Sequence, residues 1–495
     1  MLFNSFDFLV FFVAVSSLYF LMPHGFRWLF LLLASCYFYM AFVPIYILIL
    51  GFTIVIDYVA GIVIEQSKGK NRKRWLVLSL VSNIAVLAFF KYYNFFIDNL
   101  NLFIDVPEKK LHYLGILLPI GLSFHTFQAM SYTIEVYRKN QKAERHFGIY
   151  ALYVMFYPQL VAGPIERPQN MLWQFREPHR LVYGRVVAGL KLMAWGFFKK
   201  IVIADRLAPM VDFVYDNPTN FEGLPLVIAT VFFAFQIFCD FSGYCDIALG
   251  AAQVMGFRLM QNFERPYSAV SISAFWSRWH ISLSSWFRDY LYIPLGGNRV
   301  SMQWLWYRNL MLVFIISGLW HGANWTFVVW GMLHGLYLIA EIVKRNFLKN
   351  NAFIQQSKPL KSILYHFLPN RLLTFGLVCV AWVFFRANTL GDAQHIVTHF
   401  LSHWSKDIQQ ILTDETGIKR INLLYLGTDK VNFLMACGFI VLMETVHYLQ
   451  KKGILHKVLT QKPTWIRWSL YVGLVLMILW FGVFTNEKQF IYFQF

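Results

Sequence analysis

Long apolar runs constrain this chain more than any other feature. Runs of about 20 mostly apolar residues alternate with short polar breaks, and a helix of about that length crosses a bilayer. Backbone groups in lipid must be hydrogen-bonded internally, so such runs form helices. Candidate spans lie at 2–22, 27–43, 45–64, 75–98, 111–134, 183–203, 222–252, 304–320, 322–343, 372–387, 432–450 and 466–486. The sequence therefore predicts an all-α polytopic membrane protein with about 10–12 transmembrane helices.

Charge supports the same class. Apolar residues make up 58% of the 495 positions and charged residues only 14%, too few for a soluble protein. The net charge of +18 gathers in short breaks at 68–74, 138–145, 344–361 and 451–462, which indicates cytoplasmic loops rather than nucleic-acid binding. Both termini, 99–110 and the more acidic 388–431 then lie outside. The first run lacks a basic leader and a cleavage site, so we expect it to stay as a span, in one domain covering 1–495.

Two segments interrupt this pattern of spans. Residues 147–170 are apolar, but Pro158, Gly163, Pro164 and Pro168 break them, which favours a re-entrant segment beside a hollow centre. The span 222–252 carries Asp240 and Asp246, acids that must find partners in the membrane. The nearby arginines are candidates for those partners.

Residues 275–299 form the least ordinary segment. Apolar side chains recur at helical spacing from Trp276 to Leu291, with polar ones on the other side, which predicts an interfacial amphipathic helix. Ser273 is the expected N-cap, and His280 is expected on the apolar face, four residues after Trp276. Pro294, Gly296 and Gly297 then predict a loop whose backbone can approach a ligand closely.

Two histidines are the candidate catalytic residues. His321 lies between two apolar spans and His280 in the amphipathic segment, and neutral imidazole is a natural general base near pH 7. A satisfied core histidine is the alternative for any one of them, and we assign no role to His125, His334 or His447. The five cysteines lie in or beside apolar runs with no metal-ligand spacing, so no metal site is expected.

Arginine dominates the stretch 258–303. It holds five arginines and no lysine, and on the expected threading it faces the cytoplasm. Arginine offers a planar fork for phosphate, which makes Arg278 and Arg288 candidates for binding a phosphate-bearing donor. The alternative is that these arginines only anchor the helix to lipid headgroups.

Several motifs together resemble the membrane-bound O-acyltransferase family, most closely its alginate O-acetyltransferase branch. They are LPIGLSFH at 118–125, FYPQLVAGPI at 156–165, DFSGYCDIALG at 240–250, FWSRWH at 275–280, WFRDYLYIPLGG at 286–297, GLWHGANWT at 318–326 and FIYFQF at 490–495. The resemblance runs nearly end to end. It implies that His321 matches the family's catalytic histidine and His280 a second site histidine.

The resemblance also implies an architecture and a reaction. Helices would surround a central tunnel, and an acetyl group from cytosolic acetyl-CoA would leave toward the periplasm of a bacterial inner membrane. The acceptor would be an exported polysaccharide such as alginate, reached through a separate extracytoplasmic acetyltransferase. Rival readings are transfer of D-alanine or another acyl group to an envelope polymer, lipid or protein, and a polysaccharide or ion transporter. The paired half-helices expected of many transporters are missing from the sequence.

The terminal aromatic residues suggest a docking site for that partner. Phe490, Ile491, Tyr492, Phe493 and Phe495 follow the final span and would favour association if water surrounded them. The alternative is that the tail folds back into the helices or the interface.

Overall fold

The computed structural model describes residues 1–104, 110–115, 118–161, 163–350, 370–402, 404, 424–484 and 490–491. These residues are mostly helical and contain no β-strand, which confirms the predicted all-α class. Of the acids expected in the outer segment 388–431, Asp407, Asp414 and Glu415 lie outside the described residues.

The chain groups into two compact units, and the single-domain expectation stays a prediction. The first unit comprises Met1–Met193 and Tyr244–Gln261. Its helices are α1 (Phe6–Leu21), α2 (His24–Met40), η1 (Pro44–Tyr46), α3 (Ile47–Gln66), α4 (Gly69–Asn101), α5 (Leu122–Arg138), α6 (Phe147–Met155), α7 (Tyr157–Leu160), α8 (Pro168–Met171), η3 (Leu172–Arg176) and most of α9 (Tyr183–Phe197).

The second unit comprises Ala194–Gly243 and Asn262–Phe495. It contains η4 (Phe198–Ala204), α10 (Asp205–Tyr215), η5 (Pro218–Asn220), η6 (Pro266–Ser268), α12 (Ile272–Trp276), α13 (Ile281–Phe287), η7 (Arg288–Tyr292), α14 (Gln303–His321), α15 (Trp325–Asn350), α18 (Arg371–Arg386), α19 (Leu390–His399), α22 (Lys430–Lys451), α23 (Ile454–Gln461) and α24 (Thr464–Phe481). Helix α11 (Leu224–Met255) gives residues 224–243 to this unit and the rest to the first.

Six helices among the described residues are long and apolar enough to cross a membrane. They are η1–α3 together, α4, α11, α15, α22 and α24. Other expected spans correspond to helices of 15 to 19 residues, such as α1, α2, α9, α14 and α18. The span expected at 111–134 is wrong in its start, because α5 begins only at Leu122. The chain is therefore a multi-pass membrane protein, and the direction of each span stays a prediction.

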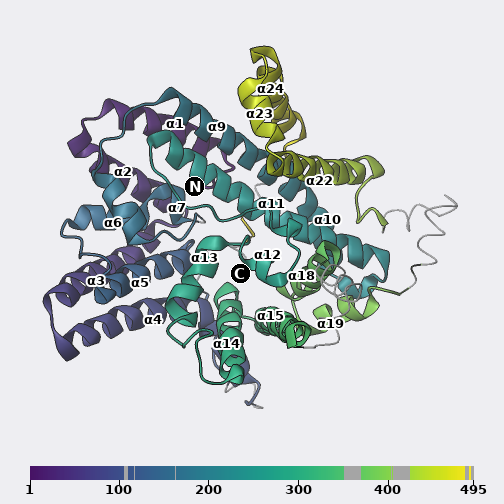
Figure 1. The fold of residues 1–495 in the computed structure, drawn as a ribbon, viewed down its shortest axis with the longest axis horizontal. Coiled ribbons are helices and arrows are strands. Elements are labelled where there is room, and N and C mark those ends of the chain that lie inside the picture. Colours follow the sequence, from purple (N-terminus) through teal and green to yellow (C-terminus); the bar gives the residue numbers. More distant parts are fainter. Residues whose placement is uncertain are drawn as a thin grey trace. The chain divides into compact units, whose positions relative to one another are not determined.

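Buried polar contacts hold α3, α4 and α5 together in the first unit, where Figure 1 shows them side by side. Asp57 accepts hydrogen bonds from Ser79 Oγ at 2.6 Å and from Asn83 Nδ2 at 2.9 Å. Ser79 also reaches Thr133 Oγ1 at 3.0 Å. Because an unsatisfied carboxylate is costly in an apolar interior, these bonds specify how the three helices pair.

The segment expected to be re-entrant is broken as predicted. Helices α6, α7 and α8 replace one long helix, and most of their side chains are buried within the first unit. Pro158 and Pro168 each stand in the first turn of a new short helix, where a missing backbone N–H does no harm.

Glycines set the crossing of α14 and α15 in the second unit. A Cβ at Gly318 would lie 2.3 Å from the carbonyl oxygen of Phe327, and one at Gly331 would lie 2.2 Å from that of Phe314. No side chain fits at such distances, so the two backbones touch there. This contact fixes the end of α14, where His321 is the last residue.

The predicted helix through 275–291 is wrong in its continuity. Helix α12 ends at Trp276, and α13 begins only at Ile281. The N-cap is Ser271, whose hydroxyl accepts from the Ala274 N–H at 3.1 Å, and not the expected Ser273. Helical spacing from Trp276 to His280 therefore does not apply. The glycine loop that follows is confirmed, with Gly296 and Gly297 at φ of 99° and 56°.

Candidate functional site

His321 closes α14 inside an aromatic enclosure. Its side chain is buried, with 4% exposure, and its ring meets Trp330 at 4.9 Å and Phe385 at 5.3 Å between centroids, both edge-on. These rings come from α15 and α18. The α14–α15 glycine contact fixes the backbone that carries the imidazole, and Gly322 then breaks the helix. The enclosure excludes bulk water from the ring.

His280 occupies a strained backbone position between α12 and α13. Its φ of 44° and ψ of 55° are left-handed, which is uncommon for a residue other than glycine. Asn262 stabilises this turn, because its backbone carbonyl accepts from Ile281 N–H at 3.0 Å and its side chain from Ser282 N–H at 3.1 Å. Such strain costs about 1–3 kcal/mol and is concentrated at functional sites.

Trp320 brings the two predicted histidines into one cluster. Its ring lies 4.8 Å from that of His321 and 6.3 Å from that of His280. Phe241 of α11 covers His280 from another side, edge-on at 4.7 Å. Both imidazoles therefore share one buried, aromatic environment within the second unit.

Burial decides the charge of His280. Its side chain is fully buried, and the loss of water lowers the pKa of its imidazole to about 3. The ring is therefore neutral near pH 7 and has one nitrogen that can accept a proton or a hydrogen bond. Two imidazoles sheltered from water in one cluster suit the removal of a proton from a hydroxyl.

The two candidate arginines have local partners. Arg278 is half-buried and donates from Nη1 to Ser268 Oγ at 2.9 Å. Arg288 begins the π-helical turn η7, is 63% exposed, and pairs through Nε with Asp289 Oδ1 at 2.8 Å. The exposed fork of Arg288 is accessible to a ligand, and its role in donor binding stays a prediction.

Asp240 pairs with a lysine, so the expectation of an arginine partner is wrong. Lys200 Nζ lies 2.5 Å from Asp240 Oδ1 and 2.8 Å from Asp205 Oδ1, and all three side chains are buried. Lys200 reaches Asp240 because α9 continues into the π-helical turn η4 beside Gly243, where a Cβ would lie 3.0 Å from Lys200 N. Sequence spacing gave no sign of this π-helical turn.

The described part of the tail lies inside the second unit. Phe490 and Ile491 are 1% and 4% exposed. The Ile491 N–H donates to Asp240 Oδ2 at 2.7 Å, and the Phe490 ring lies 5.5 Å from Phe241. For these two residues the fold-back alternative is right and the expectation of an exposed docking surface is wrong. Tyr492 to Phe495 lie outside the described residues.

Sequence reasoning missed Lys200 and Asn262, and it placed Trp320 beside His321 without predicting its contact with His280. Trp320 adjoins His321 in the sequence, which was a usable signal. Asn262 and Lys200 act through turns that no periodic pattern reveals. Among the described residues, no three His, Cys, Asp or Glu side chains form a group that could hold a metal ion.

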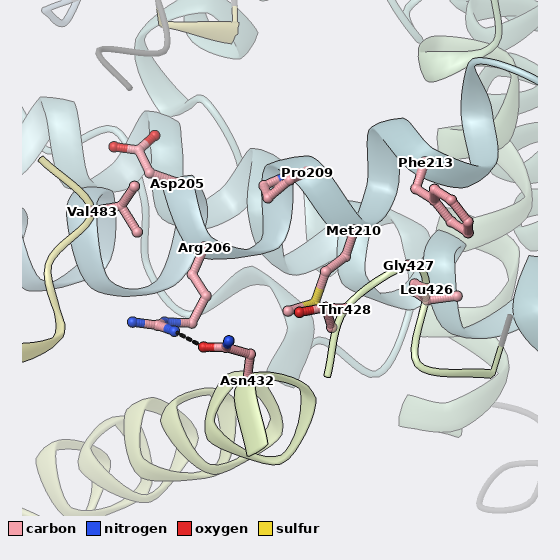
Figure 2. Close-up of a pocket in the computed structure, with 10 residues that line it drawn as sticks. All are labelled: Asp205, Arg206, Pro209, Met210, Phe213, Leu426, Gly427, Thr428, Asn432 and Val483. Atoms are coloured by element: carbon pink, nitrogen blue, oxygen red, sulfur yellow. Dashed lines mark hydrogen bonds between the residues drawn. The ribbon is translucent and has the colours of Figure 1, made fainter. Parts of the chain in front are cut away.

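A separate cavity of about 300 Å³ opens in the second unit (Figure 2). Asp205, Arg206, Asn432 and Val483 lie toward one end and Phe213 toward the other. Arg206 is already engaged there, with Asn432 Oδ1 at 2.9 Å and the Phe481 carbonyl oxygen at 2.8 Å. Neither His280 nor His321 lines this cavity, so it is distinct from the histidine cluster.

The comparisons with known proteins define the class. The model of the membrane-bound O-acyltransferase family matches residues 138–367, which include both histidines and both candidate arginines. The chain is 41% identical to the probable alginate O-acetylase AlgI of Pseudomonas aeruginosa, over 89% of this chain and 81% of that protein. The fold and these matches together define a multi-pass membrane acyltransferase.

The chain belongs to the membrane-bound O-acyltransferase family. It is 34% identical to the peptidoglycan O-acetyltransferase of Helicobacter pylori, over 94% of this chain and 91% of that protein. It is also 27% identical to the teichoic acid D-alanyltransferase of Streptococcus thermophilus, over 54% of this chain and 68% of that protein. These relatives differ in both the acyl group and the acceptor that their names give.

Proposed function

We propose that this protein moves an acetyl group from cytosolic acetyl-CoA across a bacterial inner membrane for O-acetylation of an exported polysaccharide such as alginate. The observation that carries the proposal is the buried His280–Trp320–His321 cluster in a chain about 40% identical to alginate O-acetylases. Bacterial relatives support the inner membrane as its location.

His321 acts as the general base. Its imidazole takes the proton of an acceptor hydroxyl as that oxygen attacks the thioester carbonyl, and the thiolate of coenzyme A leaves. His280, held neutral by burial, orients one of the reacting groups through a hydrogen bond. The aromatic walls keep water from competing as the acceptor.

Arg278 and Arg288 bind the acyl donor. The exposed guanidinium of Arg288, together with Arg278 in the turn between α12 and α13, offers charge-assisted contacts to the phosphates of coenzyme A. A separate extracytoplasmic acetyltransferase then transfers the acetyl group from the ester formed at that acceptor hydroxyl to a hydroxyl of the polymer, which restores the first hydroxyl. Transfer of D-alanine is a second candidate, favoured by the match to a teichoic acid D-alanyltransferase.

The test is His321→Ala in cells that make only the variant. Loss of a general base lowers the rate roughly 100- to 10,000-fold, so polymer acetylation should disappear while the protein still accumulates in the membrane. His24→Ala, which removes an exposed histidine, is the control. Near-normal acetylation in the His321 variant would refute the assignment. Isotope-labelled acetate appearing in the polymer, rather than labelled alanine, separates the two candidate donors.

A further inference from the structure

A buried ion cluster includes Asp240, the residue that precedes Phe241 in α11, and the Phe241 ring covers His280. Lys200 bridges Asp205 and Asp240, and these side chains are 1%, 4% and 3% exposed. Removing charges from water is costly, and an apolar packing of the same volume is often at least as stable. Stability alone is therefore a weak reason for three ionisable groups at this place.

The cluster joins three parts of the chain that are distant in sequence: the junction of η4 and α10, the middle of α11, and the tail. Lys200 and Asp205 come from the first part and Asp240 from the second. Asp240 also receives the Ile491 N–H at 2.7 Å. Each partner of the Asp240 carboxylate restrains the rotation and depth of α11 at this residue.

The residue that follows Asp240 is the one that touches the site. The Phe241 ring meets His280 edge-on at 4.7 Å and also contacts Phe263 at 4.9 Å and Phe490 at 5.5 Å. His280 itself stands on a strained turn. A displacement of α11 at Asp240 therefore moves the wall against which the imidazole rests.

We propose that Lys200 and Asp240 are positioning residues, whose buried ion pair fixes Phe241 so that its ring holds the His280 imidazole in the reactive orientation. The inference rests on the proposed function, because it assigns His280 to the acyl transfer. It adds residues that act through His280 without touching a substrate.

The experiment is a double-mutant cycle between Asp240→Asn and His280→Asn. The asparagine at 240 keeps the shape and can still accept from Ile491 but loses the charge, and the asparagine at 280 is expected to keep part of the activity. Acetyl transfer per amount of folded protein is measured for both single variants and the double variant. Small displacements at a reacting centre lower rates by up to about 100-fold, so Asp240→Asn should slow transfer roughly 10- to 100-fold.

The cycle separates positioning from packing. If Asp240 acts through His280, the double variant should be no slower than the slower single variant, within about twofold. The kcat should fall while the KM for the donor stays unchanged. If the double variant lost activity by the product of the two single losses, the proposal would be overturned. That is the result expected when the two residues act independently.

Two neighbouring lysines supply a matched pair. Lys199 is also buried, 3% exposed, but its Nζ donates to Ser242 Oγ at 2.9 Å. Lys200→Met should slow acetyl transfer as much as Asp240→Asn does, and should add little further loss when combined with His280→Asn. Lys199→Met should slow transfer less, and its loss should multiply with that of His280→Asn. Equal, additive losses in both lysine variants would overturn the specific role of Lys200.

Phe241→Leu tests the last link if the charge variants do not accumulate. It leaves the ion cluster intact, retains apolar bulk and removes the ring edge at His280. The same non-additivity with His280→Asn is expected, and a wild-type rate in Phe241→Leu would overturn the proposal. Full activity in His280→Ala would instead refute the proposed site, which keeps the two failures distinguishable.

Discussion

At the scale of single residues, His280 combines backbone strain with complete burial. A left-handed histidine is held by the Asn262 hydrogen bonds, and its imidazole is enclosed by Phe241 and Trp320. Folding therefore costs free energy at this residue in two ways, through backbone strain and, at low pH, through burial of a ring that cannot bind a proton. Both losses are understandable if the neutral ring has to be held in one orientation.

The burial of His280 should make the free energy of unfolding depend on pH. Burial lowers the pKa of His280 from 6.5 to about 3, so below pH 6.5 the unfolded chain binds a proton that the folded chain refuses. Stability should fall as the pH falls from 6.5 toward 3, by about 2 kcal/mol at pH 5 from this residue. Thermal unfolding at pH 8 and pH 5 should show a smaller difference in His280→Asn than in the wild type. An unchanged difference would contradict the burial argument, and His24→Ala is the exposed control.

Arg288 provides a second residue-scale prediction. A charge-assisted phosphate contact contributes about 1.5–3 kcal/mol, so Arg288→Ala should raise the KM for the acyl donor roughly tenfold or more. Arg288→Lys keeps a positive charge but loses the planar fork, and should recover only part of the affinity. Donor titrations of the purified variants decide this. If both variants bound the donor as tightly as the wild type, Arg288 would serve only to anchor the helix to lipid headgroups.

At the scale of elements, the α14–α15 contact carries His321. Gly318 and Gly331 let the two backbones meet, and the aromatic residues that enclose His321 come from α15 and α18. Helix propensity alone would favour alanine over glycine in both helices by about 1 kcal/mol. Close packing outweighs that preference here.

Gly331→Ala tests this packing. Its Cβ would lie 2.2 Å from the Phe314 carbonyl oxygen, so the helices must separate, and overpacking of this kind costs about 1–3 kcal/mol. We expect a lower unfolding temperature and slower acetyl transfer, because His321 moves with α14. Gly438→Ala in α22 is the control, since nothing lies within 4 Å of its added Cβ, and it should be neutral or stabilising. Equal stability of both variants would exclude a packing role for Gly331.

At the scale of the whole molecule, Phe490 and Ile491 are buried within the second unit. Phe490 and Ile491 pack beside α11, although they follow the last long helix in sequence. Phe490 therefore contributes to the core around Phe241. Any partner on the outer face must use other surfaces than these two residues.

Phe490→Ala should show this directly. Emptying a fully buried phenylalanine site costs about 3–5 kcal/mol, so the variant should unfold at lower temperature and lose donor turnover as well as polymer acetylation. Phe484→Ala, at a phenylalanine that is 54% exposed, is the matched control. If Phe490→Ala lost only the co-purification of an extracytoplasmic partner and kept its stability, a docking role would replace the packing role.

The sequence by itself determined the class and the position of most long helices, and it singled out the two candidate histidines. Apolar run length predicts spanning helices because lipid leaves the backbone no other way to satisfy its hydrogen bonds, and α3, α11 and α15 lie where such runs predict them. His280 and His321 stood out because a polar ring in an apolar context needs a reason. Their separate motifs also matched the family.

Tertiary structure alone decided how these residues meet. The break before His280, the π-helical turn at Lys200 and the return of Phe490 depend on contacts between segments far apart in sequence, such as Asn262 with Ile281 and Lys200 with Asp240. Periodicity describes one helix at a time, so it predicted a continuous helix through Trp276 to Leu291. It could not show which basic side chain reaches Asp240. The burial of charged and aromatic side chains is settled only when several elements pack, because their cost depends on which partners surround them.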